Sequence, residues 1–157
     1  MRARLSGRRV LTQPWAEGVP LGDSDAIDAA HPVTLTYDVG LEAGDIPAYI
    51  AEVDRAAAAG LPGVTTYHFG HMGDGNLHVM FGGAPGPMAD RDRLDRVVYD
   101  TLARFPNTTI SAEHGIGLEK RAWLDRSRTP AALAAMWQLK RSFDPKGILN
   151  PGKILEG

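Results

Sequence analysis

The strongest constraint on the fold is an Asp-Gly pair, Asp74 and Gly75, that lies between two runs of strand-forming residues. The runs VTTYHF and LHVMF are rich in β-branched and aromatic side chains, and an Asp-Gly pair between such runs is typical of a tight hairpin turn. If these two residues are the centre of the turn, His71 lies opposite His78 on the neighbouring strand. The sequence therefore predicts an antiparallel hairpin with two imidazoles on one face of a sheet.

Helices are predicted on both sides of this hairpin. Apolar residues recur at helical spacing over residues 46–57, with Asp45 placed to cap the N-terminus and Gly60 where the helix ends. The other predicted elements are strands over residues 33–39 and 108–111 and helices over 94–105, 118–127 and 130–143, the last with Thr129 as its cap and Pro130 at its first position. Residues 144–155 hold two prolines and two glycines, so they are expected to form an ordered tail or a docking strand. Together these elements predict an α+β fold, with helices packed on one face of an antiparallel or mixed sheet.

Length and charge narrow the class of protein. A chain of 157 residues is enough for one domain with a core. Its 17 basic and 19 acidic residues give a net charge of −2, which provides no general attraction to nucleic acid or anionic membranes. Cysteine is absent, so disulfides and thiolate metal sites are excluded. No run approaches the roughly 18 apolar residues of a membrane span, and a cytoplasmic location is expected.

The first 31 residues show no sustained period and are expected to form a poorly ordered arm, which leaves residues 32–157 as the domain. This arm carries four arginines and no acidic residue before Glu17. That composition also fits an organelle transit peptide, although a start codon placed inside a gene is the commoner explanation.

Histidines and a carboxylate suggest a metal site. Directly opposed residues of a hairpin have Cβ atoms roughly 4.5–5.5 Å apart, so the rings of His71 and His78 could converge on one divalent ion. Glu113, in the loop after the strand predicted over residues 108–111, is the best placed third ligand, and two histidines with one carboxylate suit Zn²⁺, Mn²⁺ or Fe²⁺ better than Mg²⁺ or Ca²⁺. An equally weighted alternative is that the two histidines only pack or hydrogen-bond at the hairpin. His31, in the arm, and His68, expected on the face opposite His71, are assigned no role.

The loop SAEHGIG places a second imidazole beside this carboxylate. His114 can accept a proton from a hydroxyl group near neutral pH, which makes it the candidate general base. Gly115 and Gly117 let a flat ring or a backbone segment come close to it. The alternative, again of equal weight, is an ordinary connection between a strand and a helix.

Three segments, HFGHMGDGNLH at 68–78, SAEHGIGLEKRAWL at 111–124 and FDPKGILNPGKIL at 143–155, together resemble the C-terminal domain of the FAD-linked oxidase family in their order and spacing. That family includes D-lactate dehydrogenases, the glycolate oxidase flavoprotein subunit and D-2-hydroxyglutarate dehydrogenase. The resemblance covers roughly residues 33–155. It implies a domain that completes the active site of an enzyme oxidising a small D-2-hydroxy acid to the 2-oxo acid, with most of the FAD held by another domain.

The same resemblance assigns roles to residues. It implies that His71, His78 and Glu113 bind a divalent metal, expected to be Zn²⁺ or Mn²⁺, and that His114 takes the proton of the substrate hydroxyl. The residues expected to lie near the flavin are Gly115, Gly117, Asn150 and Lys153.

The chain departs from the family pattern at two positions. Met80 stands where metal-dependent relatives often have a polar substrate contact, and Thr36 stands where relatives place a basic residue. The family's FAD-binding domain has no counterpart in the sequence, so we expect a fragment of a longer dehydrogenase or one half of a split enzyme whose partner supplies that domain. The alternatives are a stand-alone metal-binding module and a folded but inactive remnant.

Overall fold

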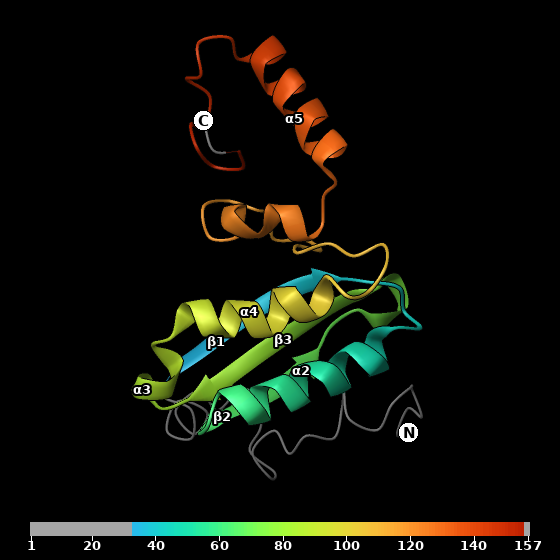
Figure 1. The fold of residues 1–157 in the computed structure, drawn as a ribbon, viewed down its shortest axis with the longest axis vertical. Coiled ribbons are helices and arrows are strands. Elements are labelled where there is room, and N and C mark those ends of the chain that lie inside the picture. The colour runs from blue at the N-terminus through green and yellow to red at the C-terminus, as the bar shows by residue number, and fades with distance from the viewer. Residues whose placement is uncertain (1–32, 156–157) are drawn as a thin grey trace.

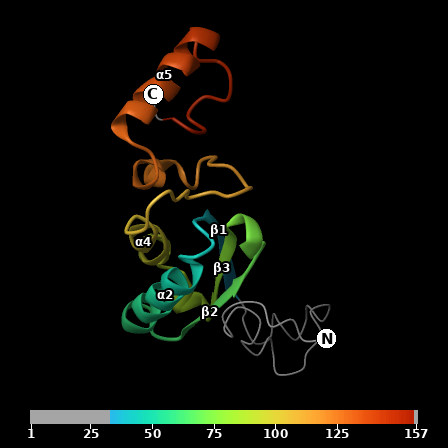
Figure 2. The same cartoon turned by 90° about the vertical axis from the view of Figure 1, so that its right-hand side faces the viewer.

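The computed structural model describes residues 33–155 and shows a three-stranded antiparallel sheet with helices on one face (Figure 1). The elements in chain order are β1 (Val33–Gly40), α2 (Ile46–Gly60), β2 (Val64–Phe69), η2 (Met72–Asp74), β3 (Asn76–Gly83), α3 (Pro85–Met88), α4 (Arg91–Leu102), η3 (Arg121–Arg126) and α5 (Pro130–Phe143). The strand order is β1-β3-β2, and α2 and α4 lie side by side against the same face, as the edge view in Figure 2 shows. The predicted α+β fold is confirmed, whereas the predicted arm lies outside the described residues.

Helix α2 is the element that the sequence predicted best. Its buried residues are Ile46, Tyr49, Ile50, Val53 and Ala57, the same five that recur at helical spacing. The helix ends at Gly60 as expected. Asp45 occupies the N-cap position, but its side chain accepts no capping hydrogen bond, so the predicted cap is wrong in that detail. Burial of the apolar stripe against the sheet therefore stabilises this helix more than its N-terminal residue does.

The core lies between the two helices and the sheet. Leu77, Val79 and Phe81 of β3 are fully buried, and the two-residue alternation of a strand places all three on the helix-covered face. Residues between them, such as His78 and Met80, belong to the opposite face. The central strand thus carries the core on one side and candidate functional residues on the other.

The β2–β3 hairpin is present, but its loop is longer than predicted. Phe69 of β2, not His71, is the register partner of His78 on β3. Residues 70–75 form the connection, which contains the single 3₁₀ turn η2. His71 has left the ladder at this point, so the predicted pairing of His71 with His78 is wrong.

Two glycines account for the longer loop. At Gly70, where φ is +145°, a Cβ would lie 2.4 Å from the carbonyl oxygen of Asn76, and at Gly75, where φ is +79°, one would lie 2.2 Å from the carbonyl oxygen of Leu41. Only glycine allows such close approaches of backbone to backbone. The carbonyl of Gly75 also accepts a 3.1 Å hydrogen bond from the N–H of Leu41, which holds the loop against the segment after β1.

The second half of the chain departs from the sequence prediction in three places. Helix α4 begins after Asp90, whose carboxylate accepts a hydrogen bond from the N–H of Arg93, and ends at Leu102 rather than at residue 105. The strand predicted over residues 108–111 is a single bridge between Thr109 and Gly40, and the N–H of Ser111 donates to the hydroxyl of Thr109 instead of to β1. The helix predicted over 118–127 is the shorter 3₁₀ helix η3, which buries a single residue, Leu124.

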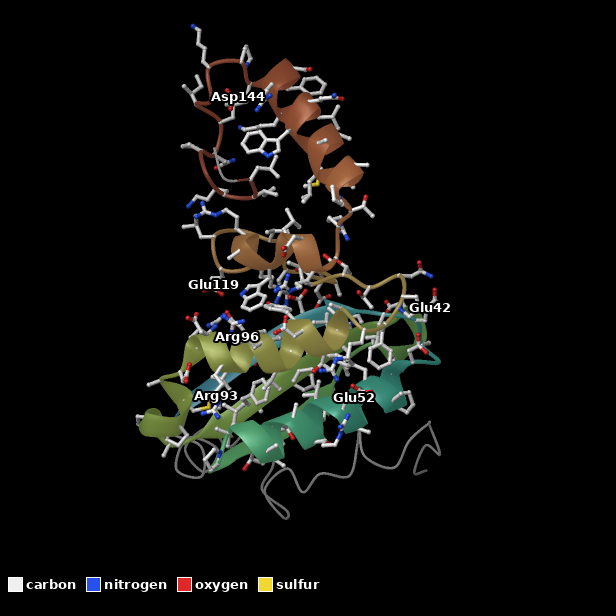
Figure 3. The ribbon with its side chains drawn as sticks, viewed as in Figure 1. Glu42, Glu52, Arg93, Arg96, Glu119 and Asp144 are labelled. Carbon is white, nitrogen blue, oxygen red and sulfur yellow. The ribbon has the colours of Figure 1, made fainter. Side chains whose placement is uncertain are left out.

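Helix α5 and the tail extend beyond η3, away from the sheet and the helices α2 and α4 that cover it (Figures 1 and 2). The hydroxyl of Thr129 accepts a hydrogen bond from the N–H of Ala132, and Pro130 is in the first turn, both as predicted. None of the residues of α5 is buried. After the helix, Asp144 accepts 2.9 Å hydrogen bonds from the N–H groups of Ile148 and Leu149, and Figure 3 shows this residue where α5 meets the tail. The tail, residues 144–155, forms neither a helix nor a strand.

Within residues 33–155, none of the helices combines the length and the apolar character that crossing a lipid bilayer requires.

The division between core and surface predicts a large difference between two identical substitutions. Leu77→Ala removes a side chain with no exposure and should lower the free energy of unfolding by about 2–5 kcal/mol, because it leaves a cavity in the core. Leu139→Ala on α5, where the side chain is 59% exposed, should change it by less than about 0.5 kcal/mol. Urea unfolding followed by circular dichroism measures both, and equal losses would contradict this description of the core.

Candidate functional site

Three of the predicted site residues converge on the sheet face that the helices leave uncovered. Nε2 of His78 lies 3.1 Å from Oε1 of Glu113, and Nε2 of His114 lies 3.6 Å from the same oxygen. One possible ligand atom from each of the three residues lies within 4.8 Å of the others. In the part of the chain that the structure describes, this is the one group of three such side chains close enough to share a metal ion.

His78 is held in a fixed orientation by its neighbours in the sheet. Its register partners are Asp38 on β1 and Phe69 on β2. The Phe69 ring stacks on the imidazole with 5.0 Å between ring centroids and 14° between planes. Only 8% of His78 is exposed, and the edge of its ring that carries Nε2 is directed toward Glu113. This edge is therefore the part of the imidazole that can take part in a site.

Asp38 holds the loop that carries the other two residues. One of its carboxylate oxygens accepts hydrogen bonds from the backbone N–H groups of Glu113, at 2.8 Å, and His114, at 3.0 Å. The same carboxylate accepts hydrogen bonds from the hydroxyl of Ser111, at 3.1 Å, and from the ammonium of Lys120. Burial alone would raise the pKa of Asp38, but the N–H of His114, the ammonium and the N–H of Glu113 outweigh it and lower that pKa to about 2.

Asp38 is the functional residue that sequence reasoning missed. It is the one charged residue in the predicted strand VTLTYDV, where it stands between the buried core residues Tyr37 and Val39. The alternation of a strand places it on the opposite face from these two, and its exposure is only 1%. A lone carboxylate within an otherwise uncharged strand was the available signal.

The structure does not bring the remaining predicted site residues into the cluster. His71 lies exposed in the loop before η2 and is not part of the group. Asn150 and Lys153 lie in the tail, which Figure 1 shows away from the sheet. Gly115 and Gly117, by contrast, follow directly after His114 with φ of +80° and +57°, and a Cβ at either position would meet no atom within 4 Å. Both glycines therefore border open space next to His114.

His68 has a structural environment, in line with the absence of a predicted role. It is 3% exposed, and its Nε2 lies 2.7 Å from Oδ1 of Asp54 on α2. That carboxylate also accepts a 2.8 Å hydrogen bond from the hydroxyl of Thr66. His68 therefore links β2 to α2 on the face away from the cluster.

The low pKa of Asp38 predicts how stability depends on pH in the metal-free protein. Because its pKa is about 2 in the folded state and 3.8 ordinarily, Asp38 contributes about 2 kcal/mol above pH 4, and this contribution is lost as the pH falls from 4 toward 2. The difference in unfolding free energy between wild type and Asp38→Asn should therefore shrink over that range in urea titrations. A constant difference would contradict the assignment.

Comparisons with known proteins identify the family of the chain. The sequence matches the family described as FAD linked oxidases, C-terminal domain, over residues 11–154. It is 40% identical over 132 residues to the D-2-hydroxyglutarate dehydrogenase of Stutzerimonas stutzeri. The aligned residues make up 80% of this chain and 28% of that protein.

Two relatives from Danio rerio are also similar. The mitochondrial D-2-hydroxyglutarate dehydrogenase is 38% identical over 125 residues, with 78% of this chain and 22% of the relative covered. The probable mitochondrial D-lactate dehydrogenase is 44% identical over 92 residues, with 55% and 18% covered. The match thus spans between 18% and 28% of the length of these three relatives. The chain belongs to the FAD-linked oxidase family and corresponds to its C-terminal domain.

Proposed function

We propose that this chain completes the active site of an FAD-dependent oxidoreductase that oxidises a D-2-hydroxy acid to the 2-oxo acid. The observation that carries the proposal is the group formed by His78, Glu113 and His114 on the open face of the sheet. The relatives support it, because their names specify dehydrogenation of D-2-hydroxyglutarate or D-lactate, which are both D-2-hydroxy acids.

The reaction removes two electrons and two hydrogens from the substrate, one as the hydroxyl proton and one with the electron pair from the α-carbon. FAD, when bound, supplies the acceptor for that hydride. His114 accepts the hydroxyl proton: its ring is 57% exposed, and its Nδ1 lies 3.5 Å from the carboxylate of Asp38. If a metal ion holds the carboxylate of Glu113, which lies 3.6 Å from Nε2, Asp38 favours the tautomer with hydrogen on Nδ1, and the lone pair of Nε2 is left for the substrate. The open space beside Gly115 and Gly117 fits the approach of a flavin ring.

We propose that a divalent metal, Zn²⁺ or Mn²⁺, binds at His78 and Glu113. Their donor atoms, one imidazole nitrogen and one carboxylate oxygen, suit both ions. The metal supplies positive charge that favours loss of the hydroxyl proton. The third ligand in our proposal is His71, which lies outside the group and would have to move toward it when the metal binds; this choice leaves His114 free to act as the base. The alternative is that His114 itself completes the ligand set, as its position in the group allows.

Four alanine variants separate these two arrangements. His78→Ala and Glu113→Ala should each weaken Mn²⁺ binding by more than about 100-fold, since both residues are ligands in either case. His71→Ala should do the same, whereas His114→Ala should retain the metal. Isothermal titration with Mn²⁺, together with metal analysis after dialysis, gives the result. If His71→Ala binds Mn²⁺ as the wild type does and His114→Ala does not, then His114 is the third ligand and its role as the base is overturned.

The C-terminal part offers a surface for the domain that holds FAD. Within residues 33–155, the large apolar side chains that are strongly exposed all follow the SAEHGIG loop; they are Leu118, Leu139, Phe143, Ile148, Leu149 and Ile154, with exposures from 46% to 81%. Exposed apolar groups gathered on one part of a molecule favour contact with another protein surface. We propose that the FAD-holding part of the enzyme covers them, either in the same longer chain or as a separate subunit. The greater length of the relatives supports this occupant.

The sheet beside the cluster favours a substrate with an uncharged side chain. Met80 of β3 pairs with Thr36 of β1 and Tyr67 of β2, one step of the strand alternation beyond His78. None of these three side chains carries a charge. Lys120, which reaches the region, is already bonded to Asp38. The second carboxylate of 2-hydroxyglutarate would therefore find no free cation among these residues, whereas the methyl group of lactate needs none.

Reconstitution tests the oxidoreductase function. The chain alone should reduce no dye, whereas the chain mixed with the FAD-holding part of the Stutzerimonas stutzeri relative should oxidise D-lactate with a kcat/KM above that for D-2-hydroxyglutarate. Met80→Lys should shift the ratio of the two toward the dicarboxylate by at least about tenfold, because it supplies the missing cation.

Two other outcomes would replace the proposal. Metal binding without activity in any mixture would favour a stand-alone metal-binding module. Absence of metal binding in the wild-type protein, together with absence of activity, would favour an inactive remnant.

A further inference from the structure

We infer that Asp38 is a positioning residue that sets the relative placement of His78, Glu113 and His114, and through them the metal affinity of the site. The inference rests on the proposed function, since it concerns the same metal site. Asp38 touches neither the substrate nor the metal; it acts through the backbone of the loop that follows Ile110 and through the ring of His114, whose Nδ1 lies 3.5 Å from its carboxylate.

Apart from Ile116, which packs against the core, the loop has few other means of support among the described residues. Residues 111–117 form neither helix nor strand, and the side chains of Glu113 and His114 are 45% and 57% exposed. Packing therefore does little to fix their directions. Two successive backbone N–H groups, those of Glu113 and His114, donate to one oxygen of Asp38 at 2.8 and 3.0 Å. Two adjacent donors converging on one acceptor constrain the peptide unit between them, and hence the directions in which both side chains leave the backbone.

The rest of the loop is closed around the same carboxylate. The hydroxyl of Ser111 contacts Asp38 at 3.1 Å and the carbonyl oxygen of Gly115 at 3.0 Å, so it spans the two ends of the turn. The ammonium of Lys120 bonds to Asp38 and lies 2.9 Å from the same hydroxyl. This cation balances the charge of a carboxylate that is almost fully buried.

Asp38 also connects the loop to the remaining member of the cluster. It is the register partner of His78 across the β1–β3 ladder, so the backbones of these two residues are fixed relative to each other by the sheet. The carboxylate of Asp38 then fixes Glu113 and His114 relative to β1. All three side chains of the cluster are thus placed by reference to one residue.

Asp38→Asn tests the inference with little change in side-chain volume. Asparagine keeps one acceptor oxygen, but its amide donates and it carries no charge, so the bonds to both N–H groups and to Lys120 cannot all persist. Co²⁺ titration followed by visible absorption reports the affinity and the geometry of the site together. We expect Asp38→Asn to bind Co²⁺ about 10–100-fold more weakly, with shifted ligand-field bands.

A matched control separates positioning from a loss of stability. Asp95 is also a buried aspartate, with hydrogen bonds to Tyr37, Arg91 and Trp123 on the helix-covered side of the sheet. Asp95→Asn should lower the free energy of unfolding in urea but leave the Co²⁺ affinity and spectrum as in wild type. Equal Co²⁺ affinity and an identical spectrum in Asp38→Asn would overturn the inference, and so would an equal loss in both variants.

A second measurement needs no metal. Hydrogen exchange followed by NMR should show that the amides of Glu113 and His114 are protected in wild type and exchange faster in Asp38→Asn. If wild type binds no Co²⁺ while these amides are protected, the proposed metal function fails and the tether to Asp38 stands. Unprotected amides in wild type would overturn the inference whatever the result with the metal.

Discussion

The buried carboxylate of Asp38 is the interaction on which the candidate site depends. A charge with 1% exposure must be satisfied by nearby donors, because water does not reach it. The donors come from a segment more than seventy residues later in the chain, which has no regular structure of its own. Satisfying one side chain of β1 therefore also shapes the loop that carries Glu113 and His114, so the stability of the fold and the geometry of the site are linked at one residue.

The two faces of the sheet separate stability from chemistry. On the covered face, Leu77 and Val79 are fully buried against the helices. A polar side chain at either position would destabilise the core. On the other face, His78 lies between them in sequence but points toward Glu113. A shift of β3 by one residue would exchange the two sets, which the core residues resist strongly. The hydrophobic pattern of the strand therefore fixes the position of the imidazole without any direct contact to it.

Sequence patterns predicted those parts of the structure that depend on local physics. The five buried residues of α2, the hydroxyl cap of α5 at Thr129 and the existence of the hairpin follow from periodicity, capping and strand propensity. The hairpin register did not follow, because it depends on the contacts of Gly70 and Gly75 with backbone atoms outside the loop. The strand predicted over residues 108–111 failed because side chains take part in its bonding: the N–H of Ser111 donates to the hydroxyl of Thr109, and the hydroxyl of Ser111 donates to the distant carboxylate of Asp38.

In the C-terminal part, local hydrogen bonds order the backbone, but few long-range contacts bury the apolar side chains. The carboxylate of Asp144 accepts hydrogen bonds from the N–H groups of Ile148 and Leu149, and these bonds order the turn after α5. The side chains of Ile148 and Leu149 nevertheless stay exposed, at 70% and 57%. A local bond that holds apolar groups in water gains little for the isolated domain, because their transfer from water is the larger favourable term in folding. The arrangement becomes favourable once another surface covers these side chains. Leu133 and Met136 of α5 and Leu155 of the tail pack against the core, so only the side of α5 and the tail that stays exposed is the surface that the FAD-holding part of the enzyme covers in our proposal.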